Sequence, residues 1–282
     1  MSNTIYTATG CSRCKIAKKF MDERGIAYRD LDIKADGKES FGQFYRNNRS
    51  AVYRGKEGIE FPVFTDETII RQGVGVVIAF LHAGTRLDGF IGRSELSHGW
   101  MDGIHVSEGD PALTDDLVAV LGYIKRQGMN LQLDTDGRNP QVLDRLLAEK
   151  LGDRVLMEVK GPLGIYGRIP GREIETAEMK KTIGIVIRFP EYQFRTTVGP
   201  VVRTKEEPPE ISYLTPEEVT ETARLIQEST GSYKQPYVLR IFEPESAADE
   251  RMRSIGKLTS NDLLRHRSAA RNFQVLTDIE KV

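Results

Sequence analysis

The chain has 282 residues, more than the roughly 100–200 residues of a typical domain, which predicts two domains. Hydrophobic residues make up 39% and charged residues 29% of the chain, as in globular rather than disordered proteins. The 40 Lys and Arg residues balance 41 Asp and Glu residues, which argues against nucleic acid or a membrane surface as a partner, and no apolar stretch reaches the ~18 residues of a membrane span.

Residues 1–84 predict a compact domain in which short strands alternate with helices. The expected elements, in the repeating order strand then helix, are 4–8, 15–24, 26–33, 41–49, 61–64 and 74–82. Residues 85–101 show no clear period, so we expect a connector there.

Two cysteines, Cys11 and Cys14, are the only ones in the chain and lie between the first strand and the first helix. The N-terminus shows no secretory signal, so we expect a cytoplasmic location, where such a pair is more often catalytic or metal-binding than structural. A helix N-terminus, with Arg13 and Lys15 nearby, lowers the pKa of the first thiol. The spacing therefore predicts Cys11 as the nucleophile and Cys14 as the thiol that resolves the mixed disulfide.

A metal site is the alternative interpretation of the same pair. Zinc takes four ligands in structural sites. Besides the two cysteines, the histidines that could complete the set are His82, His98, His105 and His266. An inert pair is the third interpretation.

The segment IYTATGCSRCKIAKKFMDERGIAYRDLDI resembles the glutaredoxins and the small redoxins that serve ribonucleotide reductase. The resemblance covers residues 4–82 and implies a thioredoxin/glutaredoxin fold. It also implies that Pro62, in the segment FPVFTDE, has a cis peptide bond and faces the CxxC pair as the third element of the site.

The same resemblance bears on the partner. Glutaredoxins that bind glutathione usually carry a Lys before the CxxC motif and a Gly-Gly-…-Asp segment after the proline strand. Here the residues before Cys11 are Thr-Ala-Thr-Gly, and residues 71–76 read RQGVGV. Glutathione, a protein disulfide and a thioredoxin-type reductant all remain open as partners.

Residues 102–245 repeat a strand–helix pattern, which predicts a parallel sheet with helices outside it. The expected strands are 103–107, 130–134, 154–160, 192–198 and 237–242. The expected helices are 114–127, 140–150, 176–187 and 215–228, with Thr114 and Thr215 as N-caps. Five strands predict a partial (β/α) barrel. Residues 246–282 predict a charged helical tail.

Polar residues lie at or near the carboxyl ends of all five expected strands, where ligand sites of parallel sheets lie. They are Ser107, Glu108, Asp110, Asp134, Thr135, Asp136, Glu158, Lys160, Arg195, Thr197, Arg240 and Glu243. They indicate either a pocket for a charged small molecule or solvated loops with internal ion pairs.

The segments SEGDPAL, LDTDGRNPQVLDRLL, MEVKGPLGIY and YQFRTTVGP, in this order, resemble the radical S-adenosylmethionine superfamily, and the activating proteins of anaerobic ribonucleotide reductase and glycyl-radical enzymes in particular. This resemblance implies that Glu108 and Asp110 lie where that superfamily holds the methionine amino group. It implies roles at the ribose and carboxylate for Asp134, Thr135, Lys160 and Arg195.

The chain contains no cysteine after Cys14, whereas the superfamily holds a [4Fe–4S] cluster with CxxxCxxC. We therefore expect no radical catalysis and no required cofactor, with glutathione and S-adenosylmethionine as the candidates. The sequence predicts a thiol–disulfide oxidoreductase whose second domain gives ligand or partner specificity, and one expected role is electron delivery to an anaerobic reductase. A metal or iron–sulfur protein, or a redox sensor, is the alternative.

Overall fold

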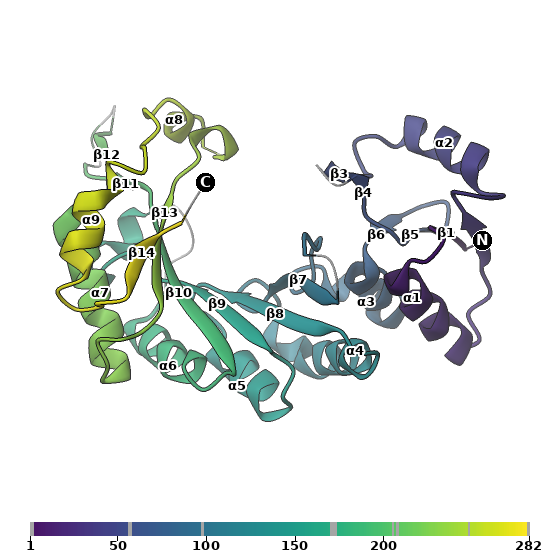
Figure 1. Ribbon diagram of the computed structural model, residues 1–282, viewed down its shortest axis with the longest axis horizontal. Helices are drawn as coiled ribbons and strands as arrows, with labels where there is room; N and C mark the ends of the chain where they lie inside the picture. Colours follow the sequence, from purple (N-terminus) through teal and green to yellow (C-terminus); the bar gives the residue numbers. More distant parts are fainter. Residues whose placement is uncertain are drawn as a thin grey trace. The chain divides into compact units, whose positions relative to one another are not determined.

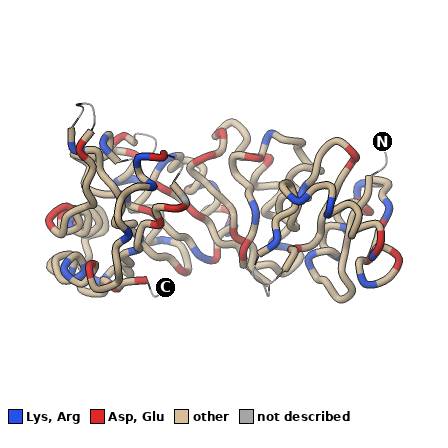
Figure 2. Tube along the Cα trace, turned by 90° about the horizontal axis from the view of Figure 1, so that it is seen from above, with Lys and Arg blue, Asp and Glu red and all other residues tan. Residues whose placement is uncertain are grey.

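The computed structural model describes residues 3–55, 58–96, 99–169, 174–204, 206, 209–247 and 249–280. The chain divides into two compact units, an N-terminal unit of residues 1–132 and a C-terminal unit of residues 133–282. None of the helices in the described part of the chain has the length and apolar character needed to cross a bilayer. Acidic and basic residues are interleaved along both units (Figure 2).

The N-terminal unit begins with a four-stranded sheet in the order β2-β1-β5-β6 (Figure 1). Strand β1 pairs in parallel with β2 and antiparallel with β5, and β5 pairs antiparallel with β6. The elements are β1 (Thr4–Thr7), α1 (Ser12–Glu23), β2 (Arg29–Asp32), α2 (Lys38–Asn47), β3 (Arg54–Gly55), β4 (Gly58–Ile59), β5 (Val63–Thr65), β6 (Ile70–Gln72) and α3 (Val74–Ala83). This arrangement confirms the predicted glutaredoxin-like fold.

Alternation along β1 builds a core on each face of this sheet. Successive strand residues point to opposite faces. Ile5 and its register partner Phe64 therefore join Ala17 of α1 and Val77 of α3 in one buried cluster. On the other face lies a second cluster, formed by Tyr6, Leu31, Phe41, Val52 and Val63. The helices thus cover both faces, and α1 begins shortly after the carboxyl end of the central strand β1.

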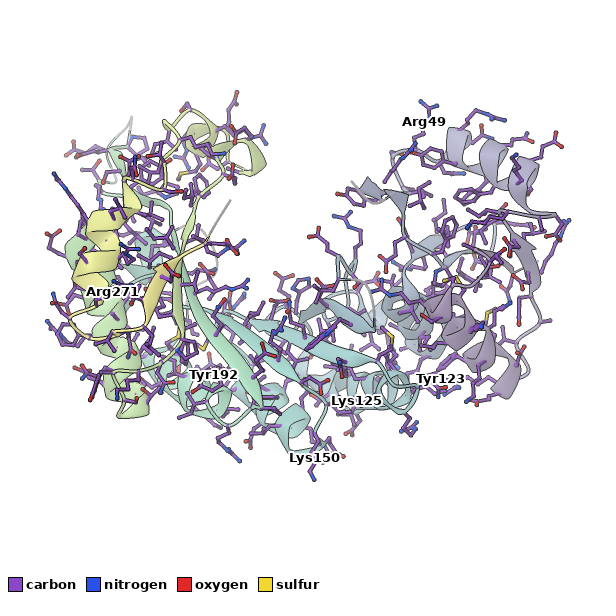
Figure 3. All side chains as sticks on the ribbon, viewed as in Figure 1. Arg49, Tyr123, Lys125, Lys150, Tyr192 and Arg271 are labelled. Atoms are coloured by element: carbon purple, nitrogen blue, oxygen red, sulfur yellow. A yellow bond between two sulfur atoms is a disulfide. The ribbon has the colours of Figure 1, made fainter. Side chains whose placement is uncertain are left out.

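The N-terminal unit continues past the expected domain end at residue 84. It also contains η1 (Gly84–Leu87), β7 (Trp100–His105), η2 (Pro111–Leu113) and α4 (Thr114–Arg126). Tyr123 of α4, labelled in Figure 3, meets the Phe20 ring of α1 edge-on at 4.9 Å, and the Arg24 guanidinium stacks 3.5 Å from that ring. These long-range aromatic contacts are the physical reason why this unit ends at residue 132 rather than at the expected residue 84.

A second sheet has six strands in the order β14-β13-β10-β9-β8-β7, rather than the expected five. Its pairs β9–β10, β10–β13 and β13–β14, all within the C-terminal unit, are parallel. The strands besides β7 are β8 (Asn130–Thr135), β9 (Arg154–Glu158), β10 (Glu191–Val198), β13 (Tyr237–Ile241) and β14 (Thr277–Ile279). The parallel strand–helix architecture is confirmed, and the division between the units falls within β8.

The sixth strand comes from the segment expected to be a charged helical tail. Residues 246–282 contain α8 (Glu250–Arg253), α9 (Leu263–Ala270) and then β14. Gln274, which is fully buried, accepts a hydrogen bond from the backbone N–H of Gln235 at 2.9 Å and donates one to the carbonyl of Ser232 at 2.9 Å. The tail is therefore part of the C-terminal core, and a helical tail was the wrong expectation for its end.

Helices flank the second sheet where the sequence predicts them. They are α5 (Pro140–Ala148), α6 (Thr176–Val186) and α7 (Pro216–Thr230), with η3 (Leu163–Arg168), η4 (Pro244–Ser246) and the hairpin β11 (Pro200–Val202)–β12 (Ile211–Tyr213) in the connections. Thr215 caps α7 through a capping box with Glu218, as predicted. Thr114 is not a cap, because its hydroxyl donates to the carbonyl of Pro111 instead.

Candidate functional site

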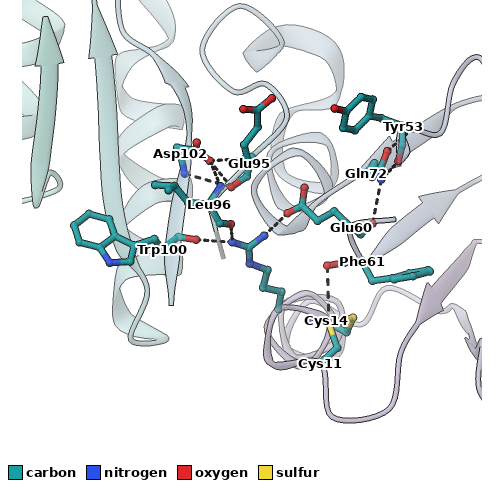
Figure 4. A network of polar contacts seen from close by, with 12 residues as sticks. Cys11, Cys14, Tyr53, Glu60, Phe61, Gln72, Glu95, Leu96, Trp100 and Asp102 are labelled. Atoms are coloured by element: carbon teal, nitrogen blue, oxygen red, sulfur yellow. Dashed lines mark hydrogen bonds and ion pairs between the residues drawn. A yellow bond between two sulfur atoms is a disulfide. The ribbon is translucent and has the colours of Figure 1, made fainter. Parts of the chain in front are cut away.

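Cys11 and Cys14 lie at the start of α1 and form a disulfide (Figure 4). Cys11 is the N-cap residue, and its Sγ accepts a hydrogen bond from the backbone N–H of Cys14 at 3.0 Å. Gly10 allows the turn before the helix, since its φ is +80°. Cys11 is partly exposed, whereas Cys14 is only 2% exposed. Of the two sulfur-bearing residues, Cys11 is thus the one that solvent reaches.

The helix start favours a thiolate on Cys11 once the pair is reduced. Backbone N–H groups in the first turn of a helix point outward and carry partial positive charge. The first turn of α1 contains no acidic residue that would oppose this effect. Lys15 lies in the same turn and is exposed.

The proline predicted as the third element lies beside the pair. The Phe61–Pro62 peptide bond is cis. The carbonyl oxygen of Phe61 lies 3.9 Å from Cys11 Sγ (Figure 4). Gly73 donates a backbone hydrogen bond of 2.9 Å to the carbonyl of Pro62, which ties the loop to the start of α3. The structure thus brings Cys11, Cys14 and the Pro62 loop together.

Arg13, whose charge the sequence predicts to act on Cys11, has its guanidinium turned into the protein, and its side chain is 13% exposed. It forms an ion pair with Glu60, donates to the carbonyl of Leu96, and donates to the carbonyl of Trp100 at 2.6 Å (Figure 4). No local signal predicts these three partners, since they are 47 to 87 residues away in the chain.

Burial raises the pKa of Glu60 to about 7, against the opposing effect of the Arg13 guanidinium. A Cβ built on Gly73 would be 3.2 Å from Glu60 Oε1, so the Glu60 carboxylate lies next to this glycine. Two residues on, a Cβ on Gly75 would be 2.0 Å from Met101 Cε. The glycines in segment 71–76 are therefore packed against side chains of this same chain.

The alternative of a metal site depends on the histidines. His82 Nε2 lies 3.1 Å from Asp116 Oδ1, and His266 Nε2 lies 2.8 Å from the carbonyl oxygen of Leu214. His98 lies outside the described residues. Within the described ranges, no three His, Cys, Asp or Glu side chains gather in a way that could hold a metal ion.

In the N-terminal unit, Glu108 and Asp110 follow β7 and are exposed. Asp110 Oδ1 accepts a hydrogen bond of 2.9 Å from the backbone N–H of Ala112 and so caps η2. Between them, Gly109 is covered by the fully buried Phe90, since a Cβ on Gly109 would lie 2.2 Å from the Phe90 ring. The ring of the connector residue Phe90 thus packs against the backbone of the Glu-Gly-Asp segment, whose two acidic residues stay exposed.

The C-terminal unit gathers two polar groups at the ends of its strands. In the first, Asp136 binds Arg138 through two hydrogen bonds of 2.9 and 2.6 Å, and Lys160 Nζ lies 3.4 Å from the same carboxylate. Asp136 is thus the partner of Lys160. The Oγ1 of Thr135, which was predicted to face a ligand, accepts a hydrogen bond of 3.1 Å from the backbone of Gly137 in a buried turn.

The second group surrounds Arg195. Its register partner across β9–β10 is Glu158, and burial lowers the pKa of Arg195, as does the nearby charge of Arg240. The charges of Asp134, Glu158 and Glu280 oppose that shift. Arg240 Nε donates to Glu280 Oε2 at 2.7 Å. Glu280 was missed, because it follows a strand that the sequence analysis did not predict.

Residues 3–47 match the glutaredoxin family. The matched residues include Cys11 and Cys14, whereas Pro62 lies beyond them. The chain thus carries a glutaredoxin domain at its N-terminus, with the two cysteines in CxxC spacing.

Similarity extends to a second class of protein. The chain is 26% identical over 168 residues to a protein of Methanocaldococcus jannaschii named "Putative glycyl-radical enzyme activating enzyme", a match that covers 57% of this chain and 63% of that relative. The chain therefore spans less than two thirds of that relative. A solved domain of the pyruvate-formate lyase-activating enzyme from Bacteroides vulgatus aligns with a TM-score of 0.42 at 13% identity, over 63% of this chain and 98% of that domain.

Proposed function

We propose that the protein is a thiol–disulfide oxidoreductase that exchanges disulfides through Cys11 and Cys14. The observation that carries the proposal is the pair itself, with a partly exposed Cys11 as the N-cap of α1, a buried Cys14 one turn on, and the Pro62 loop beside them. The helix start stabilises the thiolate, which is the reactive form.

Exchange through this pair transfers two electrons and two protons. The Cys11 thiolate attacks one sulfur of a substrate disulfide, so a Cys11–substrate disulfide forms and the released substrate thiolate takes up a proton. Cys14 then loses its proton and attacks Cys11 Sγ. The Cys11–Cys14 disulfide forms, and the second substrate thiol leaves. A thioredoxin-type dithiol reduces the pair again and is itself oxidised to a disulfide.

A protein disulfide is the substrate class that the site favours over glutathione. The segment that glutathione-binding glutaredoxins use is packed here against the chain's own Glu60 and Met101. These contacts, together with the partial exposure of Cys11, support a substrate that reaches Cys11 from its exposed side. S-adenosylmethionine enters no step of the proposed reaction.

The proposed destination of the electrons is an anaerobic reductase or a related radical enzyme. The similarity to a protein named as an activating enzyme of glycyl-radical enzymes supports this class of partner. The chain has no cysteine after Cys14 with which to hold a [4Fe–4S] cluster of its own, so its role in the proposal is thiol chemistry.

Two single-cysteine variants test the proposal. The reduced Cys14→Ser variant, incubated with a peptide that contains one internal disulfide, should accumulate a peptide adduct on Cys11, because the second thiol that releases it is missing. The matched Cys11→Ser variant should form no adduct on Cys14, which is buried. Mass spectrometry of both proteins reads out the result. Adducts on both variants alike, or on neither, would contradict the proposed exchange.

A further inference from the structure

One polar cluster of the N-terminal unit is not used by the exchange chemistry. Arg13, between the two cysteines, binds Glu60 from the segment before Pro62 and the carbonyls of Leu96 and Trp100 from the connector and β7 (Figure 4). A guanidinium has five N–H donors in a fixed fork, so it can hold three acceptors from separate segments. The redox turn is therefore tied to two other parts of its own unit.

Glu60 is an unusual partner for this arginine. Its side chain is only 16% exposed, and one of its oxygens, Oε2, is buried with no hydrogen-bond partner among the described residues. A buried carboxylate oxygen without a partner costs free energy in the ionised state. A simple structural ion pair would be expected to satisfy both oxygens, so this carboxylate is poised to take up a proton.

We infer that Arg13 and Glu60 are positioning residues of the redox site, in which Arg13 holds the CxxC turn and the protonation of Glu60 sets how strongly the Arg13 charge stabilises the Cys11 thiolate. The inference rests on the proposed function and deepens it. With Glu60 ionised, the Arg13–Glu60 pair is neutral as a whole. With Glu60 protonated, the positive charge of Arg13, two residues from Cys11, is uncompensated.

The groups that face Glu60 place its titration near neutrality. Burial raises its pKa most, to about 7, and Asp102 of β7 raises it further. Arg13 of α1 and Arg93 of the connector act in the opposite direction. Asp102 in turn accepts a hydrogen bond of 2.5 Å from the hydroxyl of Ser94. The charged groups around Glu60 thus come from α1, the connector and β7, all within one unit.

The test is the pH dependence of Cys11 alkylation by iodoacetamide in the reduced full-length protein, followed by mass spectrometry. The wild-type profile should show a second inflection near pH 7, and Glu60→Gln should remove it. Above pH 7, Glu60→Gln should raise the acid ionisation constant of the Cys11 thiol about 5-fold, as expected for removing one unit charge near a partly exposed group. The reduction potential of the pair should rise by about 20 mV at a pH where Cys11 is ionised, which is that 5-fold change expressed for a two-electron couple.

Two further variants separate positioning from simple structural support. Arg13→Met keeps the volume and removes the charge, so the alkylation midpoint of Cys11 should move up, opposite to the shift in Glu60→Gln. Glu39→Gln removes an exposed carboxylate from α2 and should leave the midpoint unchanged. A general loss of structure would not move the first two variants in opposite directions.

The outcomes distinguish this inference from the function on which it rests. If wild-type protein shows no reversible couple, the proposed function fails. If wild-type protein shows the couple but neither Glu60→Gln nor Arg13→Met moves the Cys11 midpoint or the potential, the positioning roles are overturned and the function stands.

Discussion

Cys11 and Cys14 differ in exposure because of their places on one helix turn. The N-cap residue lies at the surface where the chain enters the helix, and the residue three positions later turns toward the core. The sequence predicts the place of the pair, because the CxxC motif lies between a strand and a helix. It could not predict that Arg13 turns inward, because the acceptors that hold it come from residues 60, 96 and 100.

Glu60 gives the stability of the protein a specific pH dependence. Its pKa is about 7 in the folded protein, above its ordinary value of 4.5, so the folded state binds the proton more tightly. This contribution is fully present below pH 4.5 and is lost as the pH rises through 7. The free energy of unfolding of Glu60→Gln, relative to that of wild type, should therefore rise by about 2 kcal/mol from pH 5 to pH 8.

Urea unfolding of the oxidised wild-type and Glu60→Gln proteins at pH 5 and pH 8 measures this difference. Glu39→Gln, at an exposed position of α2, serves as the control and should show no such dependence. A stability difference between Glu60→Gln and wild type that is the same at both pH values would show that Glu60 does not titrate in this range.

Helix α3 packs closely on β7 because Gly75 has no side chain and leaves room for Met101. A Cβ on Gly75 would lie 2.0 Å from Met101 Cε, so Gly75→Ala should destabilise the protein by about 1–3 kcal/mol through overpacking. Gly42 of α2 is the matched control, since the nearest atom to its Cβ position is an arginine side-chain nitrogen at 3.7 Å. Gly42→Ala should stabilise by about 0.5–1 kcal/mol, the ordinary gain from replacing a helical glycine.

Chemical denaturation of the two alanine variants compares them directly. The predicted result is a change of opposite sign in the two helices. Equal stabilisation by both substitutions would mean that α3 and β7 do not pack as described.

The last strand depends on a buried amide. Gln274 holds the start of β14 through hydrogen bonds with Gln235 and Ser232, so Gln274→Ala should cost about 2–4 kcal/mol by leaving both backbone groups unpaired. Leu276→Ala, two residues on and 56% exposed, should change stability by less than about 0.5 kcal/mol. Thermal unfolding measures the stability of both variants. Equal losses of stability would argue against a buried, hydrogen-bonded Gln274.

Across the molecule, long periodic helices and strands could be predicted from the sequence, whereas very short ones could not. The helix expected at 176–187 is Thr176–Val186, because eleven residues with an apolar face carry a clear period. Strands β6 and β14 have three residues each, too few for any alternation, and both were missed. Since β14 was missed, so was Glu280, which pairs with Arg240 beside Arg195.

The domain organisation shows the same limit. A repeated strand–helix pattern that begins at residue 102 predicted a new domain there. Instead, Phe20 and Tyr123 join the glutaredoxin domain to α4 in one compact unit. Contacts between residues about a hundred positions apart leave no local pattern.

The reduction potential of the Cys11–Cys14 pair decides whether the protein exchanges disulfides through these two cysteines. The purified protein is equilibrated across a set of redox buffers with and without a chelator, its free thiols are alkylated, and the oxidised fraction is read by mass spectrometry. The account predicts a reversible two-electron couple between roughly −200 and −270 mV, the range of glutaredoxins and thioredoxin. A pair that forms no disulfide in any buffer, or that alkylates only after a chelator is added, would contradict it and identify the cysteines as metal ligands.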